Sequence, residues 1–172
     1  MIPIHVDVAI IGSGTAGIAA YQSASAHTAS LLLIEGGAYG TTCARVGCMP
    51  SKLLIAAAEV ADQARHADRF GVRVEALTVD GAAVMARVRR ERDRFVGFVL
   101  ETVESFPPAG RLTAKVSFQD ANTLVTEQGQ LICAQRIVIT TGGIPVLPPL
   151  LKGLSRNLLT NEPLAKPTYS NF

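Results

Sequence analysis

Three glycines near the N-terminus constrain the fold of this 172-residue chain more than any other feature. They form the pattern Gly12-x-Gly14-x-x-Gly17. An almost continuously apolar run, residues 6–11, precedes them and is typical of a strand buried on both faces of a parallel sheet. An alanine-rich stretch, residues 15–26, follows and predicts a helix. In this setting the glycines permit a tight turn, close approach of a pyrophosphate to the backbone, and close packing of helix on strand.

A second predicted strand ends at an acidic residue. Residues 30–34 are apolar enough to be buried, and Glu35 follows them directly. A carboxylate at this place can accept hydrogen bonds from ribose hydroxyls, and it disfavours a 2′-phosphate by charge repulsion. The strand–helix–strand pattern therefore predicts a dinucleotide site made by Gly12, Gly14, Gly17 and Glu35.

The rest of the chain predicts two long helices and a β-rich region. The helices are expected over residues 49 to about 67 and 80 to about 106. An antiparallel meander of three strands is expected next, over residues 112–118, 123–127 and 131–134, followed by a buried strand over residues 136–140. We therefore expect an α/β, Rossmann-like fold whose parallel sheet and helices are joined by a three-stranded antiparallel meander.

These patterns predict that the chain is divided into a domain and a tail. Residues 1–145 are expected to form one dinucleotide-binding domain that includes the cysteine pair described below. Residues 146–172 are proline-rich and have no clear period, so they are expected to be a linker or tail.

Composition excludes several functional classes. Hydrophobic residues make up 48% and charged residues 17%, as in an ordinary globular protein. A net charge of +2 is too small to indicate nucleic-acid binding, and the arginines of residues 87–94 alternate with Glu91 and Asp93, which is typical of a solvated helix face. No apolar run approaches the roughly twenty residues that cross a bilayer. The N-terminus does not resemble a targeting signal, so we expect a cytoplasmic protein.

Two of the three cysteines, Cys43 and Cys48, lie close together in sequence. Regular helix through both would separate their Cα atoms by roughly 8–9 Å, more than the roughly 7 Å that a disulfide tolerates. Pro50 is typical of a first helical turn, so Cys48 is expected at a helix start and Cys43 in the preceding loop. The positive end of a helix dipole favours a thiolate and therefore thiol chemistry.

Metal binding is the main alternative function for the cysteines. A zinc site needs four ligands, and the further candidates, Cys133, His5, His27 and His66, show no ligand spacing. We therefore expect no metal site, and Cys133 is expected to be an inert buried thiol. The pair could still be two unremarkable thiols, or a two-thiol site for a soft metal ion.

The run of residues 40–52, Gly-Thr-Thr-Cys-Ala-Arg-Val-Gly-Cys-Met-Pro-Ser-Lys, carries a resemblance to a known family. It resembles the redox-active segment of the flavin-dependent pyridine nucleotide–disulfide oxidoreductases, which include dihydrolipoamide dehydrogenase, glutathione reductase and mercuric reductase. The end of the last strand, Thr140-Thr141-Gly142, is similar to that family's second flavin-contact motif. With the glycine pattern, the resemblance covers residues 4 to about 162.

The resemblance implies a bound FAD and a role for each cysteine. Cys48 would be the sulfur beside the flavin, and Cys43 would be the interchange thiol that attacks the substrate disulfide. The further cofactor contacts that the family implies are Thr42, Lys52, Val116, Thr141 and Gly142. Arg45 replaces a common asparagine, and we expect its charge to lower the pKa of one of the thiols.

The resemblance also implies an activity for the complete protein. Ser51 favours dihydrolipoamide dehydrogenase or mercuric reductase over glutathione reductase. The preferred hypothesis is that the complete protein transfers electrons from a dihydrolipoyl dithiol through Cys43–Cys48 and FAD to NAD. The resemblance also implies a homodimer. A mercuric or glutathione reductase-like member, or a non-catalytic dinucleotide-binding module, are the alternatives. Family members continue into a nicotinamide-binding domain and an interface domain, so these 172 residues alone are predicted to be truncated and inactive.

Overall fold

The structure, a computed structural model, describes residues 2–154, and the chain divides into two compact units. The sheet unit comprises Met1–Thr41 and Phe98–Ile144. The helical unit comprises Thr42–Gly97 and Pro145–Phe172. The predicted tail falls mostly outside the described residues, and its described part contains one 3-10 helix, Pro149–Leu154. The predicted domain boundary at residue 145 stays a prediction.

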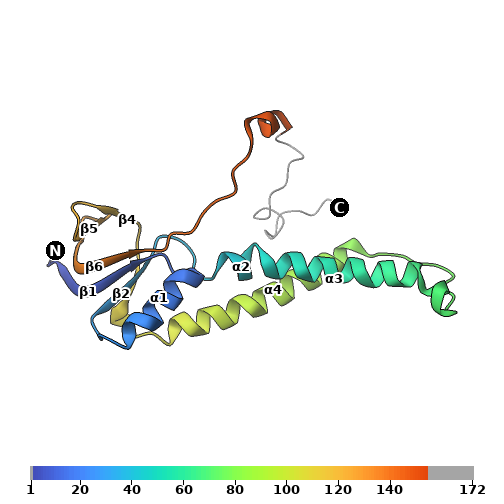
Figure 1. Cartoon of the computed structure of the whole chain (residues 1–172), viewed down its shortest axis with the longest axis horizontal. Coiled ribbons are helices and arrows are strands. Elements are labelled where there is room, and N and C mark those ends of the chain that lie inside the picture. The colour runs from blue at the N-terminus through green and yellow to red at the C-terminus, as the bar shows by residue number, and fades with distance from the viewer. Residues whose placement is uncertain (1, 155–172) are drawn as a thin grey trace. The chain divides into compact units, whose positions relative to one another are not determined.

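The sheet unit is built on one six-stranded sheet (Figure 1). Its elements are β1 (Ile4–Ile11), α1 (Thr15–Ser25), β2 (Leu31–Glu35), the end of α4 (Gly81–Glu104), β3 (Arg111–Thr113), β4 (Val116–Phe118), β5 (Thr123–Thr126) and β6 (Leu131–Ile139). The strand order is β3-β2-β1-β6-β5-β4. The pairs from β3 to β6 are parallel, and β6-β5-β4 are antiparallel. The predicted mixed α/β class is confirmed.

Two predicted strand boundaries were wrong. The predicted strands 131–134 and 136–140 are one strand, β6, because β1 pairs with it in parallel along both parts. The antiparallel strand β5 begins at Thr123, opposite Cys133, and pairs only with the first part of β6. Beyond it, the Asn122 side-chain amide donates to the carbonyls of Ala134 and Gln135, at 3.0 and 3.2 Å. The predicted strand 112–118 is instead two strands, β3 and β4, at opposite edges of the sheet.

Only Ala114 and Lys115 join the two edge strands. Neighbouring strands lie about 4.8 Å apart, so a flat sheet of this order would separate its edges by about 24 Å. Three peptide units span at most about 11 Å. The sheet must therefore curl until its edges approach each other. The Ala114 N–H donates to the Glu35 carbonyl at 2.9 Å, and the Glu127 N–H donates to the Lys115 carbonyl at 3.2 Å.

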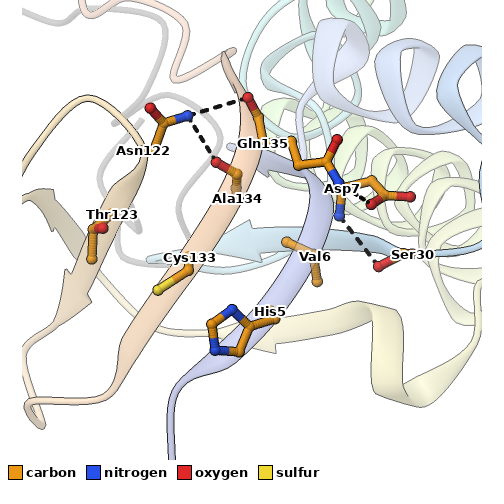
Figure 2. A pocket seen from close by; sticks show the side chains of 9 residues that line it. All are labelled: His5, Val6, Asp7, Ser30, Asn122, Thr123, Cys133, Ala134 and Gln135. Carbon is orange, nitrogen blue, oxygen red and sulfur yellow. Dashed lines mark hydrogen bonds between the residues drawn. The ribbon is translucent and has the colours of Figure 1, made fainter.

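A β-bulge interrupts β1 at Asp7. The N–H groups of Asp7 and Val8 both donate to the Ser30 carbonyl, at 2.9 and 3.2 Å, so two residues of β1 oppose one of its neighbour. The alternation of side chains shifts there, and Val6 and Val8 pack in different hydrophobic clusters. The Asp7 carboxylate accepts a hydrogen bond from the Gln135 amide at 2.8 Å, which ties the bulge to β6 (Figure 2).

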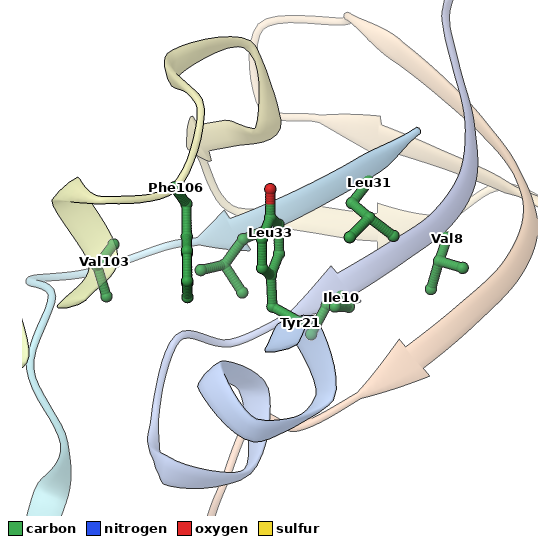
Figure 3. Packing of buried hydrophobic residues seen from close by; sticks show 7 residues of the cluster. All are labelled: Val8, Ile10, Tyr21, Leu31, Leu33, Val103 and Phe106. Carbon is green, nitrogen blue, oxygen red and sulfur yellow. The ribbon is translucent and has the colours of Figure 1, made fainter. Parts of the chain in front are cut away.

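Hydrophobic clusters lie on both faces of the sheet. On one face the Tyr21 and Phe106 rings stack with centroids 4.1 Å apart. They pack with Val8, Ile10, Leu31, Leu33 and Val103 (Figure 3). The cluster on the other face comprises Ala9, Leu32, Ile34, Leu124, Ile132 and Ala134. Strand β2 supplies alternate residues to the two clusters, which is why its sequence is continuously apolar.

The helical unit contains α2 (Thr42–Arg45), α3 (Cys48–Arg65), a 3-10 turn (Ala67–Phe70) and α4 as far as Gly97. The Arg87 guanidinium donates to the Leu53 carbonyl at 3.4 Å, which joins α4 to α3. Helix α3 begins at Cys48, as predicted. Cys43 lies in the one-turn helix α2 and not in a loop, which corrects the prediction. Within residues 2–154, no helix has the length and apolar character needed to span a bilayer.

Candidate dinucleotide and thiol sites

The glycine turn between β1 and α1 has the geometry that its sequence predicts. Gly12 has φ +102°, and a Cβ built there would lie 2.5 Å from the Thr140 carbonyl oxygen. A Cβ on Gly17 would lie 1.8 Å from the Gly12 carbonyl oxygen, so the helix can pack this closely only with glycine. A Cβ on Gly14 would meet no atom within 4 Å. The turn is therefore closed on the protein side and open at Gly14, where α1 begins without a side-chain cap.

Thr140, at the end of β6, fixes this turn. Its hydroxyl donates to the carbonyls of Ile11 and Gly12, at 2.8 and 2.9 Å. Thr141 and Gly142, which the sequence analysis named as cofactor contacts, follow directly, and Gly142 has φ +72°. The predicted contacts from two distant parts of the sequence thus meet at one edge of the sheet. Thr140 belongs to the segment that resembles the second flavin-contact motif, but the sequence did not predict that its hydroxyl would hold the glycine turn.

Glu35 faces the same turn. Its Oε2 accepts hydrogen bonds from the Ser13 N–H at 2.8 Å and from the Ser13 hydroxyl at 2.7 Å. Its Oε1 accepts one from the Gly37 N–H at 2.9 Å. Ser13 is 1% exposed. Sequence reasoning placed Glu35 at this edge but missed Ser13, which stands at an unspecified position of the glycine pattern.

The curl of the sheet brings β4 to the turn after Glu35. A Cβ built on Gly36 would lie 2.8 Å from the Lys115 Cγ, one residue before Val116. All the predicted nucleotide-binding residues of the sheet unit therefore lie on the glycine turn or on segments that contact it or its acidic neighbour. These residues are Gly12, Gly14, Gly17, Glu35, Val116, Thr141 and Gly142.

The predicted thiol pair lies in the helical unit. Cys43 and Cys48 are free thiols that lie close enough for Cys48 to shift the pKa of Cys43, with Cys43 half-buried and Cys48 exposed. The turn between α2 and α3 makes this approach possible. A Cβ on Gly47 would lie 3.1 Å from the Thr42 carbonyl oxygen and 3.5 Å from the Cys43 Cα, so a side chain there would crowd the turn.

The environment of Cys43 favours its protonated form. The hydrogen bond with the Cys48 thiol raises the pKa of Cys43 most, and burial and the charge on Cys48 raise it further. The Cys48 backbone N–H and the Lys52 ammonium act in the opposite direction. We expected Arg45 to be the cation that lowers a thiol pKa, but at Cys43 that cation is Lys52. The Arg45 carbonyl instead accepts a hydrogen bond from Arg92 at 3.5 Å.

The remaining predicted contacts, Thr42 and Lys52, flank the thiols. Thr42 begins α2, and its carbonyl accepts the Val46 N–H at 3.0 Å. Lys52 lies one turn after Cys48 on α3. The Ser51 hydroxyl donates to the Cys48 carbonyl at 3.0 Å. Thr42, Cys43, Cys48 and Lys52 therefore form one group on two short stretches of the helical unit.

Cys133 is not the buried thiol that we expected. It is half-buried on β6, in register with His5 on β1, and both line a pocket of about 550 Å³ in the sheet unit (Figure 2). The pocket lies near the start of β1, away from the glycine turn that follows this strand. Over residues 2–154, histidine, cysteine and acidic side chains form no group of three or more that could hold a metal ion.

Comparison with known proteins identifies a family. Residues 6–166 match the family model described as pyridine nucleotide-disulphide oxidoreductase. A dihydrolipoyl dehydrogenase from Chlamydia muridarum is 33% identical over 144 residues, which are 81% of this chain and 30% of that protein. A mercuric reductase from Shewanella putrefaciens is 36% identical over 152 residues, covering 83% of this chain and 27% of the reductase.

A solved structure agrees with these matches. The HOCl-induced flavoprotein disulfide reductase RclA from Escherichia coli superposes with a TM-score of 0.62 at 25% identity, covering 83% of this chain and 29% of that one. The chain thus spans about 30% of the length of its dihydrolipoyl dehydrogenase relative. Since the family model covers most of the sequence, this chain belongs to the pyridine nucleotide-disulphide oxidoreductase family.

Proposed function

We propose that the chain is the N-terminal, FAD-binding and redox-disulfide portion of a flavoprotein disulfide oxidoreductase. The preferred activity of the whole protein is that of dihydrolipoamide dehydrogenase. The observation that carries this proposal is the proximity of Cys43 on α2 to Cys48 at the start of α3, which is close enough for Cys48 to raise the pKa of Cys43. Two neighbouring thiols can close a disulfide by losing two electrons and two protons. Relatives named dihydrolipoyl dehydrogenase support a lipoyl substrate.

The residues of the sheet unit fit the adenosine and pyrophosphate part of FAD. The open side of the turn at Gly14 admits a pyrophosphate to the start of α1. The Glu35 carboxylate faces the same turn and can accept a hydrogen bond from ribose. The backbone at Val116 would contact the adenine, and Thr141, Gly142, Thr42 and Lys52 would contact the rest of the cofactor. When bound, FAD supplies a two-electron acceptor between the dithiol and NAD.

The two cysteines have different roles in the proposed reaction. One thiolate of a dihydrolipoyl group attacks the Cys43 sulfur of the closed disulfide, which forms a mixed disulfide and releases the Cys48 thiolate. The second substrate thiolate then attacks its own mixed-disulfide sulfur and releases Cys43. The substrate is oxidised to its cyclic disulfide, and the protein pair is reduced. A half-buried Cys43 and an exposed Cys48 leave the pair accessible.

A mercuric reductase activity is the second candidate. The relative with that name is 36% identical to this chain, and two thiolates suit a soft metal ion such as Hg²⁺. The two candidates differ in what reacts with the pair. A lipoyl substrate exchanges disulfides with Cys43, whereas Hg²⁺ would be held by both sulfurs.

The test is an absorption spectrum of the purified 172-residue chain with FAD, before and after reduction by dihydrolipoamide. We expect bound flavin, and a change in its spectrum on reduction because a reduced sulfur would lie against it. Cys48→Ser should bind flavin without that change, while the matched control Cys133→Ser should behave as wild type. A chain that binds no flavin, or a Cys48→Ser variant that keeps the change, would contradict the proposal.

Three further expectations belong to this proposal. The chain alone should not reduce NAD⁺ with dihydrolipoamide, and turnover by the purified chain would contradict that. The complete protein is proposed to be a homodimer in the cytoplasm. Turnover by the complete protein separates the two candidates, because reduction of NAD⁺ by dihydrolipoamide favours the dehydrogenase, whereas reduction of Hg²⁺ with NAD(P)H as electron donor favours the mercuric reductase.

A further inference from the structure

We infer that Ser13 is a positioning residue for the adenosine ribose, because its hydroxyl orients the Glu35 carboxylate toward the ribose 2′-hydroxyl. The inference rests on the proposed function, since it concerns the same nucleotide site. It assigns a role to a residue at a variable position of the glycine pattern, between Gly12 and Gly14. Ser13 would itself touch Glu35 and not the ribose.

Ser13 makes a double contact with one carboxylate oxygen. Its N–H and its hydroxyl both donate to Glu35 Oε2, at 2.8 and 2.7 Å. The Gly37 N–H donates to the other oxygen, Oε1, at 2.9 Å. Donors from the glycine turn and from the turn after β2 therefore hold the two oxygens. Ser13 is 1% exposed, so water does not compete freely for its hydroxyl.

The hydroxyl adds orientation that a backbone donor alone does not give. A glutamate side chain has three rotatable bonds, and ordering it on binding weakens affinity. The N–H of residue 13 would remain with any residue except proline, whereas the second hydrogen bond to Oε2 requires a side-chain donor. Hydrogen bonds to an ionised group are stronger than neutral ones. Ser13 therefore orders the carboxylate before the nucleotide arrives.

A merely structural role for Ser13 makes a different prediction. If the hydroxyl only stabilises the turn, its loss should weaken every nucleotide equally, because all of them use the turn for their pyrophosphate. If it orients Glu35 toward the 2′-hydroxyl, its loss should weaken only nucleotides that carry this hydroxyl. ADP and 2′-deoxy-ADP differ in this one hydroxyl and therefore separate the two roles.

The experiment titrates ADP and 2′-deoxy-ADP into the full 172-residue chain by calorimetry, or by NMR where binding is weak. For Ser13→Ala we expect about tenfold weaker ADP binding, the size of one hydrogen bond, and less than about twofold weaker 2′-deoxy-ADP binding. The matched control is Ser25→Ala, which removes a hydroxyl that donates to the Gln22 carbonyl on the exposed end of α1. It should change neither affinity.

The outcomes distinguish this inference from the proposed function. An equal loss for both nucleotides, or no loss for either, overturns the positioning role while FAD binding stands. A wild-type chain that binds neither FAD nor ADP overturns the proposed function and this inference with it. Should Ser13→Ala unfold, Ser13→Cys keeps a weak donor of similar size, and its ADP affinity should still fall more than its 2′-deoxy-ADP affinity.

Discussion

The sheet unit and the helical unit differ in how their functional residues are held. The sheet unit contains two hydrophobic clusters, and side chains such as Ile10 and Leu33 are fully buried. Among the described residues of the helical unit, only Ala44, Pro50 and Val88 are buried. Val60 and Phe70, by contrast, are 67% and 88% exposed. Helices gain most of their stability from packing. Because few side chains of the helical unit are buried, fewer packing contacts stabilise its helices.

The difference shows why the two candidate sites should respond differently to mutation. The glycine turn is fixed by backbone contacts with β6, within a unit that has its own core. The thiol pair is fixed by one tight turn between α2 and α3. We therefore expect large losses of stability in the first region, and changes of reactivity with little loss of stability in the second.

The largest effect should come from opening a cavity in the core of the sheet unit. Leu33 has no exposed surface, so Leu33→Ala should lower the free energy of unfolding by about 3 kcal/mol or more. Leu77 in the helical unit is 39% exposed, and Leu77→Ala should cost less than about 1 kcal/mol. Urea unfolding of both variants measures the contrast. Equal losses in the free energy of unfolding would show that the side chains of the two units are packed equally tightly.

A smaller effect is expected at the glycine turn. Gly17→Ala places a methyl group where the Gly12 carbonyl oxygen lies at 1.8 Å, so it should destabilise by about 1–3 kcal/mol and displace the turn. Gly14→Ala meets no atom within 4 Å and should change stability by no more than about 0.5 kcal/mol. Thermal unfolding gives the first quantity. If both substitutions are equally tolerated, the turn is less tightly packed than described.

The smallest effect on stability, but a clear one on reactivity, should come from the thiol pair. The pKa of Cys43 is raised above its ordinary value of 9.0, chiefly by the hydrogen bond with Cys48. The protonated Cys43 thiol therefore contributes to the free energy of unfolding below pH 9.0. This contribution is lost as the pH rises through the pKa of Cys43 in the folded state. In a Cys133→Ser background, Cys48→Ala should move the alkylation profile of Cys43 to lower pH.

The same measurement tests the charges near Cys43. Lys52→Met removes a charge that lowers the pKa of Cys43, so its alkylation profile should move to higher pH. Arg45→Asn serves as the matched control and should leave the profile in place. A profile that moves with Arg45 and not with Lys52 would restore our original expectation.

Local patterns predicted the elements that depend on neighbouring residues. Strands β1 and β2, helix α1 and the start of α3 at Cys48 follow from apolar runs, alanine content and Pro50. The placement of Glu35 beside the glycine turn also followed from spacing. These features need only the geometry of one strand–helix–strand unit.

The features that the sequence did not predict depend on contacts between residues that lie far apart in the sequence. The division of the predicted strand 112–118 follows from β3 pairing with β2, while β4 pairs with β5. The bulge at Asp7 and the double contact of Ser13 with Glu35 depend on residues more than twenty positions apart. The pKa of Cys43 depends on which charges fold toward it, and sequence distance favoured Arg45 over Lys52. None of these has a local signature.

The pairing of β1 with β6 also has a consequence for synthesis on the ribosome. The turn after β1 is fixed by Thr140, 128 positions after Gly12. The first strands emerge long before their central partner exists, with apolar side chains on both surfaces. Until β6 is translated, the apolar surfaces of β1 and β2 lack their central partner strand. During this time, chaperone binding to the nascent chain competes with aggregation.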